Sequence, residues 1–232
     1  MIHATKEFVN TTENSRQDTT LRAQVQYGLR SAILDGQFKA GQKLVERELC
    51  ELTGASRSIL REALINLEAN GLIERESYRG FSVSQISPRK VKEIFELRTT
   101  LETMAAELFT ERASEQELNT LRDVLAELEQ GMALSDLGKI RAAKERYYDV
   151  LFTGCRNVEI RRALENVIDR IHYLRGRSMM DPDRRIASLN EMRRLTAALI
   201  SRDQLEARAA SVAHLTAAQD IALKILAEGK IE

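Results

Sequence analysis

Residues 44–87 read LVERELCELTGASRSILREALINLEANGLIERESYRGFSVSQIS, and this stretch decides the fold of the first part of the chain. Apolar residues at helical spacing predict two short helices, separated at Thr53-Gly54-Ala55, the second ending at Asn70-Gly71. Ser56 is placed to cap the second helix. Alternating apolar and polar residues around a turn at 78–80 then predict a β-hairpin. The pattern is that of a winged helix-turn-helix.

The sequence on either side sets the limits of this domain. Residues 1–19 are polar with little apolar periodicity, which predicts a disordered tail. Helical spacing begins at Leu21, so we expect the winged helix-turn-helix over residues 20–86. Ser87-Pro88 is typical of a helix start, and residues 87–232 are expected to form an all-helical bundle of six or seven helices. The expected fold is mainly α, with the hairpin as a small β wing.

Composition narrows the class of protein. The chain has no run of 18 apolar residues, so no membrane span is expected. It has two cysteines, Cys50 and Cys155, and no apolar leader, which predicts a cytoplasmic protein without a disulfide framework. Its net charge is zero, but residues 20–90 hold 11 Lys/Arg against 8 Asp/Glu. This small local excess agrees with a module that faces phosphates.

The second helix of the pair carries the residues of a DNA-reading helix. Its leucines share one face, whereas Arg57, Ser58 and Arg61 lie in its first turns and project elsewhere. An arginine fork suits guanine N7/O6 or a phosphate. Ser56 and the N–H groups behind it can hold a phosphate, and Arg79-Gly80 at the hairpin tip can reach the adjacent minor groove. The structural alternative is a pair of arginines on a solvated face.

Four motifs in this region carry a family resemblance: GQKLVEREL at 41–49, SRSILREAL at 56–64, LEANGLI at 67–73, and RG at 79–80. Together they resemble the DNA-binding domain of the GntR family. VKEIFELRTTLETMAAEL at 91–108 resembles the first helix of the FadR-type C-terminal domain, the FCD subgroup. The resemblance implies a DNA-binding transcriptional regulator, expected to be a repressor, with double-stranded operator DNA and a second copy of the chain as partners. It assigns DNA contacts to Arg47, Ser56, Arg57, Arg61 and Gly80.

The resemblance also bears on a metal site. Most FCD domains hold a divalent metal through Asp-x3-His on one helix and single histidines on two later helices, and the metal holds a carboxylate effector. Aligned on Thr153–Asn157, this chain has Lys144 in place of the Asp, Tyr148 and Met192 in place of two histidines, and only His214 as a remaining ligand. We therefore expect no metal and no other cofactor.

The same positions carry a second hypothesis. Lys144 falls on an apolar helical stripe with Ile140, Tyr147 and Leu151, and a buried ammonium invites an anionic partner. We expect it to anchor a small anionic metabolite, a carboxylate or a phosphate. The other residues expected at this site are Arg98 as a second clamp, Tyr148, Met192 and His214. The alternative is that Lys144 reaches solvent, Tyr148 is core and His214 is a packed remnant.

Two alternative functions are an enzyme and a constitutive DNA-binding protein. The sequence has no Gly-rich phosphate loop, no His/Cys metal spacing and no nucleophile elbow, so an enzyme is not expected. The other rival is a constitutive dimeric DNA-binding protein whose helical domain is a vestigial sensor without an effector. A thermal-shift screen of metabolites distinguishes this constitutive protein from a metabolite sensor, because only a sensor gains stability from a ligand.

Overall fold

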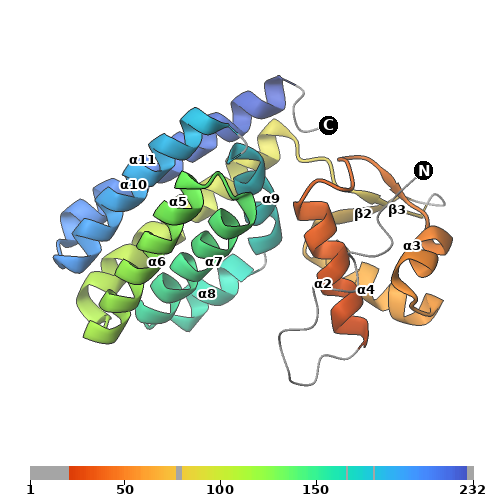
Figure 1. Ribbon diagram of the computed structural model, residues 1–232, viewed down its shortest axis with the longest axis horizontal. Coiled ribbons are helices and arrows are strands. Elements are labelled where there is room, and N and C mark those ends of the chain that lie inside the picture. Colours follow the sequence, from red (N-terminus) through yellow and green to blue (C-terminus); the bar gives the residue numbers. More distant parts are fainter. Residues whose placement is uncertain (1–20, 77–79, 166, 180, 229–232) are drawn as a thin grey trace. The chain divides into compact units, whose positions relative to one another are not determined.

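The computed structural model describes residues 21–76, 80–165, 167–179 and 181–228, and within them the chain forms two compact units that divide between Ile86 and Ser87 (Figure 1). The fold is mainly α with one small antiparallel sheet, which confirms the fold class expected from the sequence. The tail expected over residues 1–19 and Arg79 at the hairpin tip lie outside the described residues.

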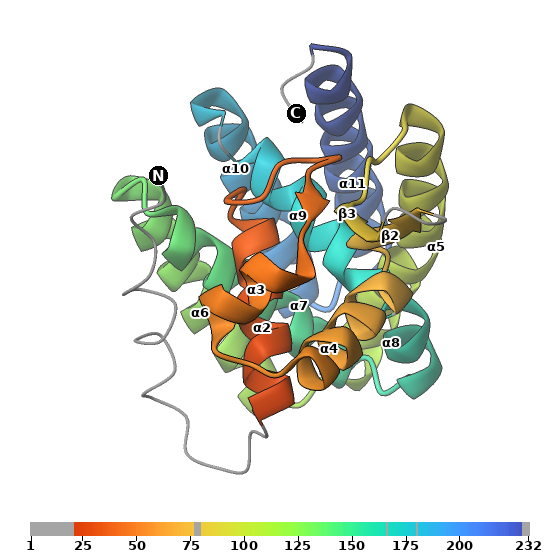
Figure 2. The same ribbon diagram turned by 90° about the vertical axis from the view of Figure 1, so that its right-hand side faces the viewer.

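The first unit is a winged helix-turn-helix (Figure 2). Apolar residues of the first helix pack against the leucine face of the third, and Leu60, Leu64 and Leu67 are fully buried there. The elements in order are α2 (Leu21–Leu34), β1 (Lys43–Leu44), α3 (Glu46–Thr53), α4 (Arg57–Ala69), β2 (Ile73–Glu76) and β3 (Gly80–Val83).

The turn between α3 and α4 uses the residues that the sequence marks. Gly54 ends α3 with a φ of 69°, a left-handed conformation that suits glycine, and its N–H donates to the Cys50 carbonyl. The Ser56 hydroxyl then accepts a hydrogen bond from the Ile59 N–H at 3.4 Å and caps α4. These two caps set where α4 begins.

The wing is a three-stranded antiparallel sheet in the order β1-β3-β2. Leu44 pairs with Phe81 and Ile73 pairs with Val83, and all four side chains are buried. The sequence predicted the β2–β3 hairpin but not β1, because two residues carry no recognisable periodicity.

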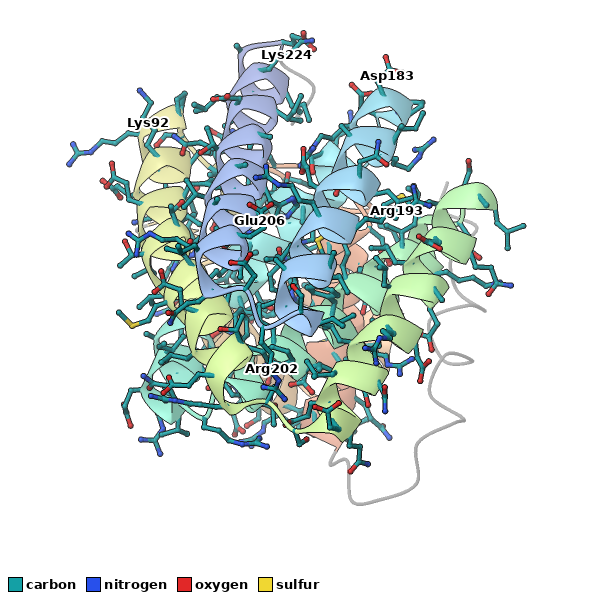
Figure 3. The ribbon with its side chains drawn as sticks, turned by 90° about the vertical axis from the view of Figure 1, so that its left-hand side faces the viewer. Lys92, Asp183, Arg193, Arg202, Glu206 and Lys224 are labelled. Carbon is teal, nitrogen blue, oxygen red and sulfur yellow. The ribbon has the colours of Figure 1, made fainter. Side chains whose placement is uncertain are left out.

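The second unit contains seven helices within the described residues. α5 packs along α11, α6 along α7, and α10 against both α11 and α6 (Figures 1 and 3). The helices are α5 (Pro88–Arg112), α6 (Glu115–Ala133), α7 (Leu137–Gly154), α8 (Val158–Glu165), α9 (Ile168–Ser178), α10 (Pro182–Ile200) and α11 (Gln204–Ala227). In the described ranges, none of the helices combines the length and apolar character that a membrane span requires.

Polar residues fix the ends of these helices. Ser114 and Glu117 form the reciprocal capping box at the start of α6. At the turn between α10 and α11, Arg202 donates to the Thr110 and Ala113 carbonyls at 2.9 and 2.8 Å (Figure 3). This contact ties the turn to the end of α5, so that α10 and α11 are held in place beside it.

Candidate functional site

The outer side of α4 presents the residues expected to read DNA. Arg57, Ser58 and Arg61 are exposed, whereas the leucines on the opposite side of the helix are buried. Ser56 is exposed at the N-terminus of α4, where the first N–H groups of the helix have no partners within the helix. The first turns of α4 therefore combine two cationic side chains with a helix N-terminus, and both attract phosphate.

Arg61 also contacts the preceding helix. Its Nε lies 3.1 and 3.0 Å from the two carboxylate oxygens of Glu46 on α3, and its side chain is 64% exposed. An exposed ion pair of this kind contributes only about 0–1 kcal/mol, so DNA can compete for the guanidinium at little cost. The sequence did not predict this contact, since it depends on how α3 packs against α4. Arg47, next along α3, is exposed.

The wing begins at an exposed glycine. Gly80 has a φ of 87°, and a Cβ built on it would meet nothing within 4 Å. The backbone conformation, not crowding, therefore favours glycine here. Behind it, the Arg75 guanidinium lies 4.8 Å from the centre of the Phe81 ring, a cation–π contact across the hairpin.

In the helical unit, Lys144 is buried. Its side chain projects from α7, is 2% exposed, and donates a 2.7 Å hydrogen bond from Nζ to the hydroxyl of Ser188 on α10. The hydroxyl is neutral and satisfies one of the three N–H donors of an ammonium. This geometry rules out the alternative in which Lys144 reaches solvent.

A small cavity of about 10 Å³ lies beside Lys144, about the space that one water molecule needs. None of the described residues that line it is acidic, and the cationic ones come from four helices. The polar lining residues are Arg98, Lys144, Arg175, Ser178, Arg184 and His214, and the apolar ones are Phe95, Leu174, Met179 and Ala218.

Two carboxylates sit behind this cavity and pair with some of its cations. Arg98 donates from Nε to Glu102 at 2.6 Å, and both side chains are 3% exposed. Arg184 donates from Nη1 and Nη2 to Glu191 at 2.5 and 2.8 Å. Glu191 also accepts a 2.6 Å hydrogen bond from Nδ1 of His214. Arg98 and Arg184 are thus neutralised by direct partners.

Other donors in the site have no partner among the described residues. Nη1 of Arg175 and Nε of Arg184 are buried without a hydrogen bond. The Arg175 guanidinium lies 4.2 Å from the centre of the Tyr148 ring. A buried donor left unsatisfied costs about 1–3 kcal/mol, so these groups favour the entry of an acceptor.

The cluster of cations shifts the protonation of its members. Burial lowers the pKa of Lys144 well below its ordinary value, and Arg175 and Arg184 lower it further against the opposing effect of Glu191. Burial also lowers the pKa of His214 to about 4, although its hydrogen bond to Glu191 acts in the opposite direction. His214 is therefore neutral at pH 7, with its proton on Nδ1 facing the carboxylate.

The structure brings together three of the five residues expected around the effector. Arg98, Lys144 and His214 line the cavity. Tyr148 and Met192 do not: the Tyr148 ring lies against Arg175, and Met192 is fully buried and has no polar group to offer a ligand. Outside this group, Nδ1 of His172 lies 3.1 Å from a carboxylate oxygen of Glu145.

Sequence reasoning missed six polar residues of this site: Glu102, Arg175, Ser178, Arg184, Ser188 and Glu191. A signal was present on α10, where Arg184, Ser188 and Glu191 stand at i, i+4 and i+7 and therefore share one face. No comparable pattern marks Arg175, because α9 is short and its packing against α11 is set by tertiary contacts.

Comparison with protein families accounts for both units. Residues 21–83 match the model of the bacterial regulatory proteins of the gntR family, and residues 93–217 match the FCD domain. The chain belongs to the GntR family. It is a transcriptional regulator with a helix-turn-helix DNA-binding domain and an FCD domain, as the sequence motifs indicated. Its relatives are transcriptional regulators and not enzymes.

Individual relatives agree with this assignment. The chain is 31% identical to the helix-turn-helix-type transcriptional regulator YdhC of Bacillus subtilis (strain 168), over 87% of this chain and 91% of that protein. It is 29% identical to the Nta operon transcriptional regulator of Aminobacter aminovorans, over 82% of this chain and 88% of that protein. The solved structure of McbR/YncC of E. coli shares the fold, with a TM-score of 0.77 and 23% identity, over 90% of this chain and all of that one.

The residues of this chain do not fit the metal that the FCD resemblance implies. Lys144 places an ammonium where a carboxylate ligand is expected, and His214 is already hydrogen-bonded to Glu191. Within residues 21–76, 80–165, 167–179 and 181–228, no group of three His, Cys, Asp or Glu side chains is placed to hold a metal ion. A tight site needs three or four such ligands.

Proposed function

We propose that this GntR-family regulator binds operator DNA as a homodimer and that a small anionic metabolite, bound in the FCD domain, releases it from the DNA. In this scheme the protein is a repressor and works in the bacterial cytoplasm, where its operator is. The observation that carries the proposal is the buried Lys144, which faces a cavity lined by cations and by no described acidic residue.

The DNA-binding part of the proposal rests on the exposed face of α4. Arg57, Ser58 and Arg61 on α4, Ser56 at its start, Arg47 on α3 and Arg79-Gly80 in the wing are the proposed contacts. Two copies related by a two-fold axis would present two such helices to an operator with inverted half-sites. We assign residues 20–86 to this function and residues 87–232 to effector binding and dimerisation.

The effector part rests on electrostatics. Buried donors without acceptors destabilise the free protein, and an anion that enters the cavity relieves this and favours the protonated form of Lys144. A ligand lowers DNA affinity when it binds the released conformation of the regulator more tightly than the DNA-bound conformation. Lys144 is the anchor in this proposal, with His214 beside it.

The experiment combines two measurements on the full chain. Footprinting on the region upstream of its own gene locates the operator, and a thermal-shift screen of anionic metabolites then identifies a stabilising ligand. The proposal expects this ligand to lower operator affinity. A protein that binds its operator but is neither stabilised nor released by any anion would be a constitutive DNA-binding protein.

A further inference from the structure

We propose that the cavity binds the phosphoryl group of a phosphate monoester, held by Lys144 on α7, Arg175 on α9 and Arg184 on α10. This inference rests on the proposed function and names the chemical class of its effector. It also replaces Arg98 as the second clamp by Arg175.

The charges around the cavity call for a dianion. Arg98 is neutralised by Glu102, and Arg184 is neutralised by Glu191. Two basic side chains remain without a carboxylate in contact among the described residues, namely Lys144 and Arg175, and an anion in the cavity favours the protonated form of Lys144. A carboxylate group carries one negative charge, whereas a phosphate monoester carries about 1.5 to 2 at neutral pH. Of these two groups, only the phosphate monoester can balance two positive charges, those of Arg175 and protonated Lys144, by itself.

The unsatisfied donors point to the same group. Nη1 of Arg175 and Nε of Arg184 are buried without partners, and the Lys144 ammonium has two N–H bonds beyond the one to Ser188. These donors come from three different helices and border one cavity. A phosphoryl group offers three peripheral acceptor oxygens, one for each helix, whereas a carboxylate offers two.

The size of the cavity excludes a ligand that needs two separate acidic groups there. At about 10 Å³ it has room for a single water molecule, so even one acidic group enters only when a lining side chain moves aside. Arg175 can do this, because it is half-buried, forms no ion pair among the described contacts, and has a long side chain. Arg98 cannot swing away without breaking its buried pair with Glu102.

The test is isothermal titration calorimetry on the full-length protein without DNA. The probes are inorganic phosphate, glycerol phosphate, acetate and malonate at equal ionic strength. Phosphate and glycerol phosphate should bind saturably and more tightly than both carboxylates. Lys144→Met and Arg175→Met should each weaken phosphate binding about thirtyfold or more, the loss typical of removing one partner of a desolvated charge pair.

Two further variants keep the result interpretable. Arg193→Met removes the same charge from the outer surface of α10 (Figure 3), where Arg193 is 51% exposed and pairs with Glu129, and it should bind phosphate like the wild type. Arg175→Lys keeps the charge but loses the guanidinium fork, so it should bind phosphate with an intermediate affinity. Circular dichroism at the titration temperature shows whether each variant is folded.

Each outcome decides the inference. Phosphate binding that is weakened by Lys144→Met and Arg175→Met but not by Arg193→Met supports it. If malonate or acetate binds in a Lys144-dependent way and phosphate does not, this inference is wrong while the proposed anion sensor stands. Phosphate binding that is the same in all variants is adventitious and overturns the inference. If no probe binds, the phosphate inference and the anion-sensing part of the proposed function are both wrong.

Discussion

Lys144 on α7 donates a 2.7 Å hydrogen bond to the hydroxyl of Ser188 on α10, and both side chains are buried. Among the described contacts, the ammonium therefore meets a neutral partner rather than a carboxylate. A buried charge without a counter-ion makes the protein sensitive both to pH and to anions. The first three predictions concern the cluster around this lysine.

The first prediction concerns the effector response. Lys144→Met keeps most of the stem volume and deletes the charge, so it should abolish effector-induced release from DNA while leaving operator affinity in the absence of effector near that of the wild type. The effector affinity should fall about thirtyfold or more. The measurement is operator affinity against effector concentration, with Arg193→Met as the control. Identical curves for wild type and Lys144→Met would place Lys144 outside the effector site.

The second prediction concerns stability and pH. The pKa of Lys144 in the folded protein lies well below its ordinary value of 10.5, chiefly because the side chain is buried. Between the two values the unfolded chain binds the extra proton, so the free energy of unfolding should rise with pH by up to about 1.4 kcal/mol per unit. Lys144→Met lacks this pH dependence. Its free energy of unfolding relative to the wild type should therefore be highest at the lowest pH of that window.

Urea unfolding at pH 7, 8 and 9 provides the measurement. The chain has no tryptophan, so unfolding is followed by circular dichroism. The free energy of unfolding of Lys144→Met minus that of the wild type should decrease steadily as pH rises. The other ionisable groups are common to both proteins and cancel in the difference. Two parallel curves would mean that Lys144 keeps its ordinary pKa and is hydrated.

The third prediction concerns the carboxylate behind the cavity. Burial raises the pKa of Glu191, but hydrogen bonds from His214 and Arg184 outweigh this and bring it to about 2. Because this value lies below the unfolded value of 4.5, Glu191 stabilises the fold above pH 4.5 and loses its contribution as pH falls toward 2.

Glu191→Gln should therefore lower the free energy of unfolding at pH 7 by about 1–3 kcal/mol, because Arg184 and His214 lose an ionised acceptor. The difference in melting temperature between the two proteins, measured at pH 7, 5, 4 and 3, should become smaller as pH falls. Glu129→Gln, which removes a half-exposed ion pair with Arg193, is the control and should have little effect at any pH. A constant gap between Glu191→Gln and wild type would contradict the lowered pKa of Glu191.

Much of this cluster follows from local sequence, and the exceptions have identifiable causes. The helical stripe of Ile140, Lys144 and Leu151 predicts that Lys144 points inward, because periodicity alone determines which side of a helix is buried. Arg98 was expected to clamp a ligand, yet Glu102 stands four residues later on the same face and neutralises it. The i, i+4 spacing of Arg98 and Glu102 is visible in the sequence and predicts this ion pair, so an inward arginine at this position does not by itself indicate a ligand clamp.

The rest of the site depends on contacts between helices. Arg175 joins the cavity because α9 packs on α11, and Ser188 meets Lys144 because α10 and α7 each place one residue at the same point. The ion pair between Arg61 and Glu46 likewise depends on how α3 packs against α4. The periodicity of one helix does not predict contacts between residues of different helices, so only the three-dimensional structure places these residues.

The fourth prediction concerns metal content. Protein purified without a histidine tag should contain far less than one divalent metal ion per chain, because Lys144, Tyr148 and Met192 stand at the positions where the FCD resemblance implies metal ligands. One remaining histidine cannot supply the three or four ligands of a tight site. Elemental analysis is the measurement. One zinc, nickel or manganese per chain, removable by a chelator with a fall in melting temperature, would show that the alignment of these positions is wrong.

The last prediction concerns the DNA-reading helix. Arg57→Ala and Arg61→Ala should each weaken binding to the operator by about 1–3 kcal/mol if the guanidinium contacts guanine bidentately, with a smaller and sequence-independent loss if it contacts phosphate. Arg193→Ala in the FCD domain removes an equivalent charge and should leave operator affinity unchanged.

Glu46→Gln distinguishes a contact made by Arg61 from a purely structural role of that residue. Glu46 holds Nε of Arg61 in the absence of DNA, so neutralising it removes a competitor for the guanidinium and a negative charge near the phosphates. Operator affinity should therefore rise slightly in Glu46→Gln and fall in Arg61→Ala, and the double variant should resemble Arg61→Ala. Competition binding against operator and random DNA at two salt concentrations measures these effects. If Arg57→Ala and Arg61→Ala footprint like the wild type, a helix other than α4 occupies the major groove.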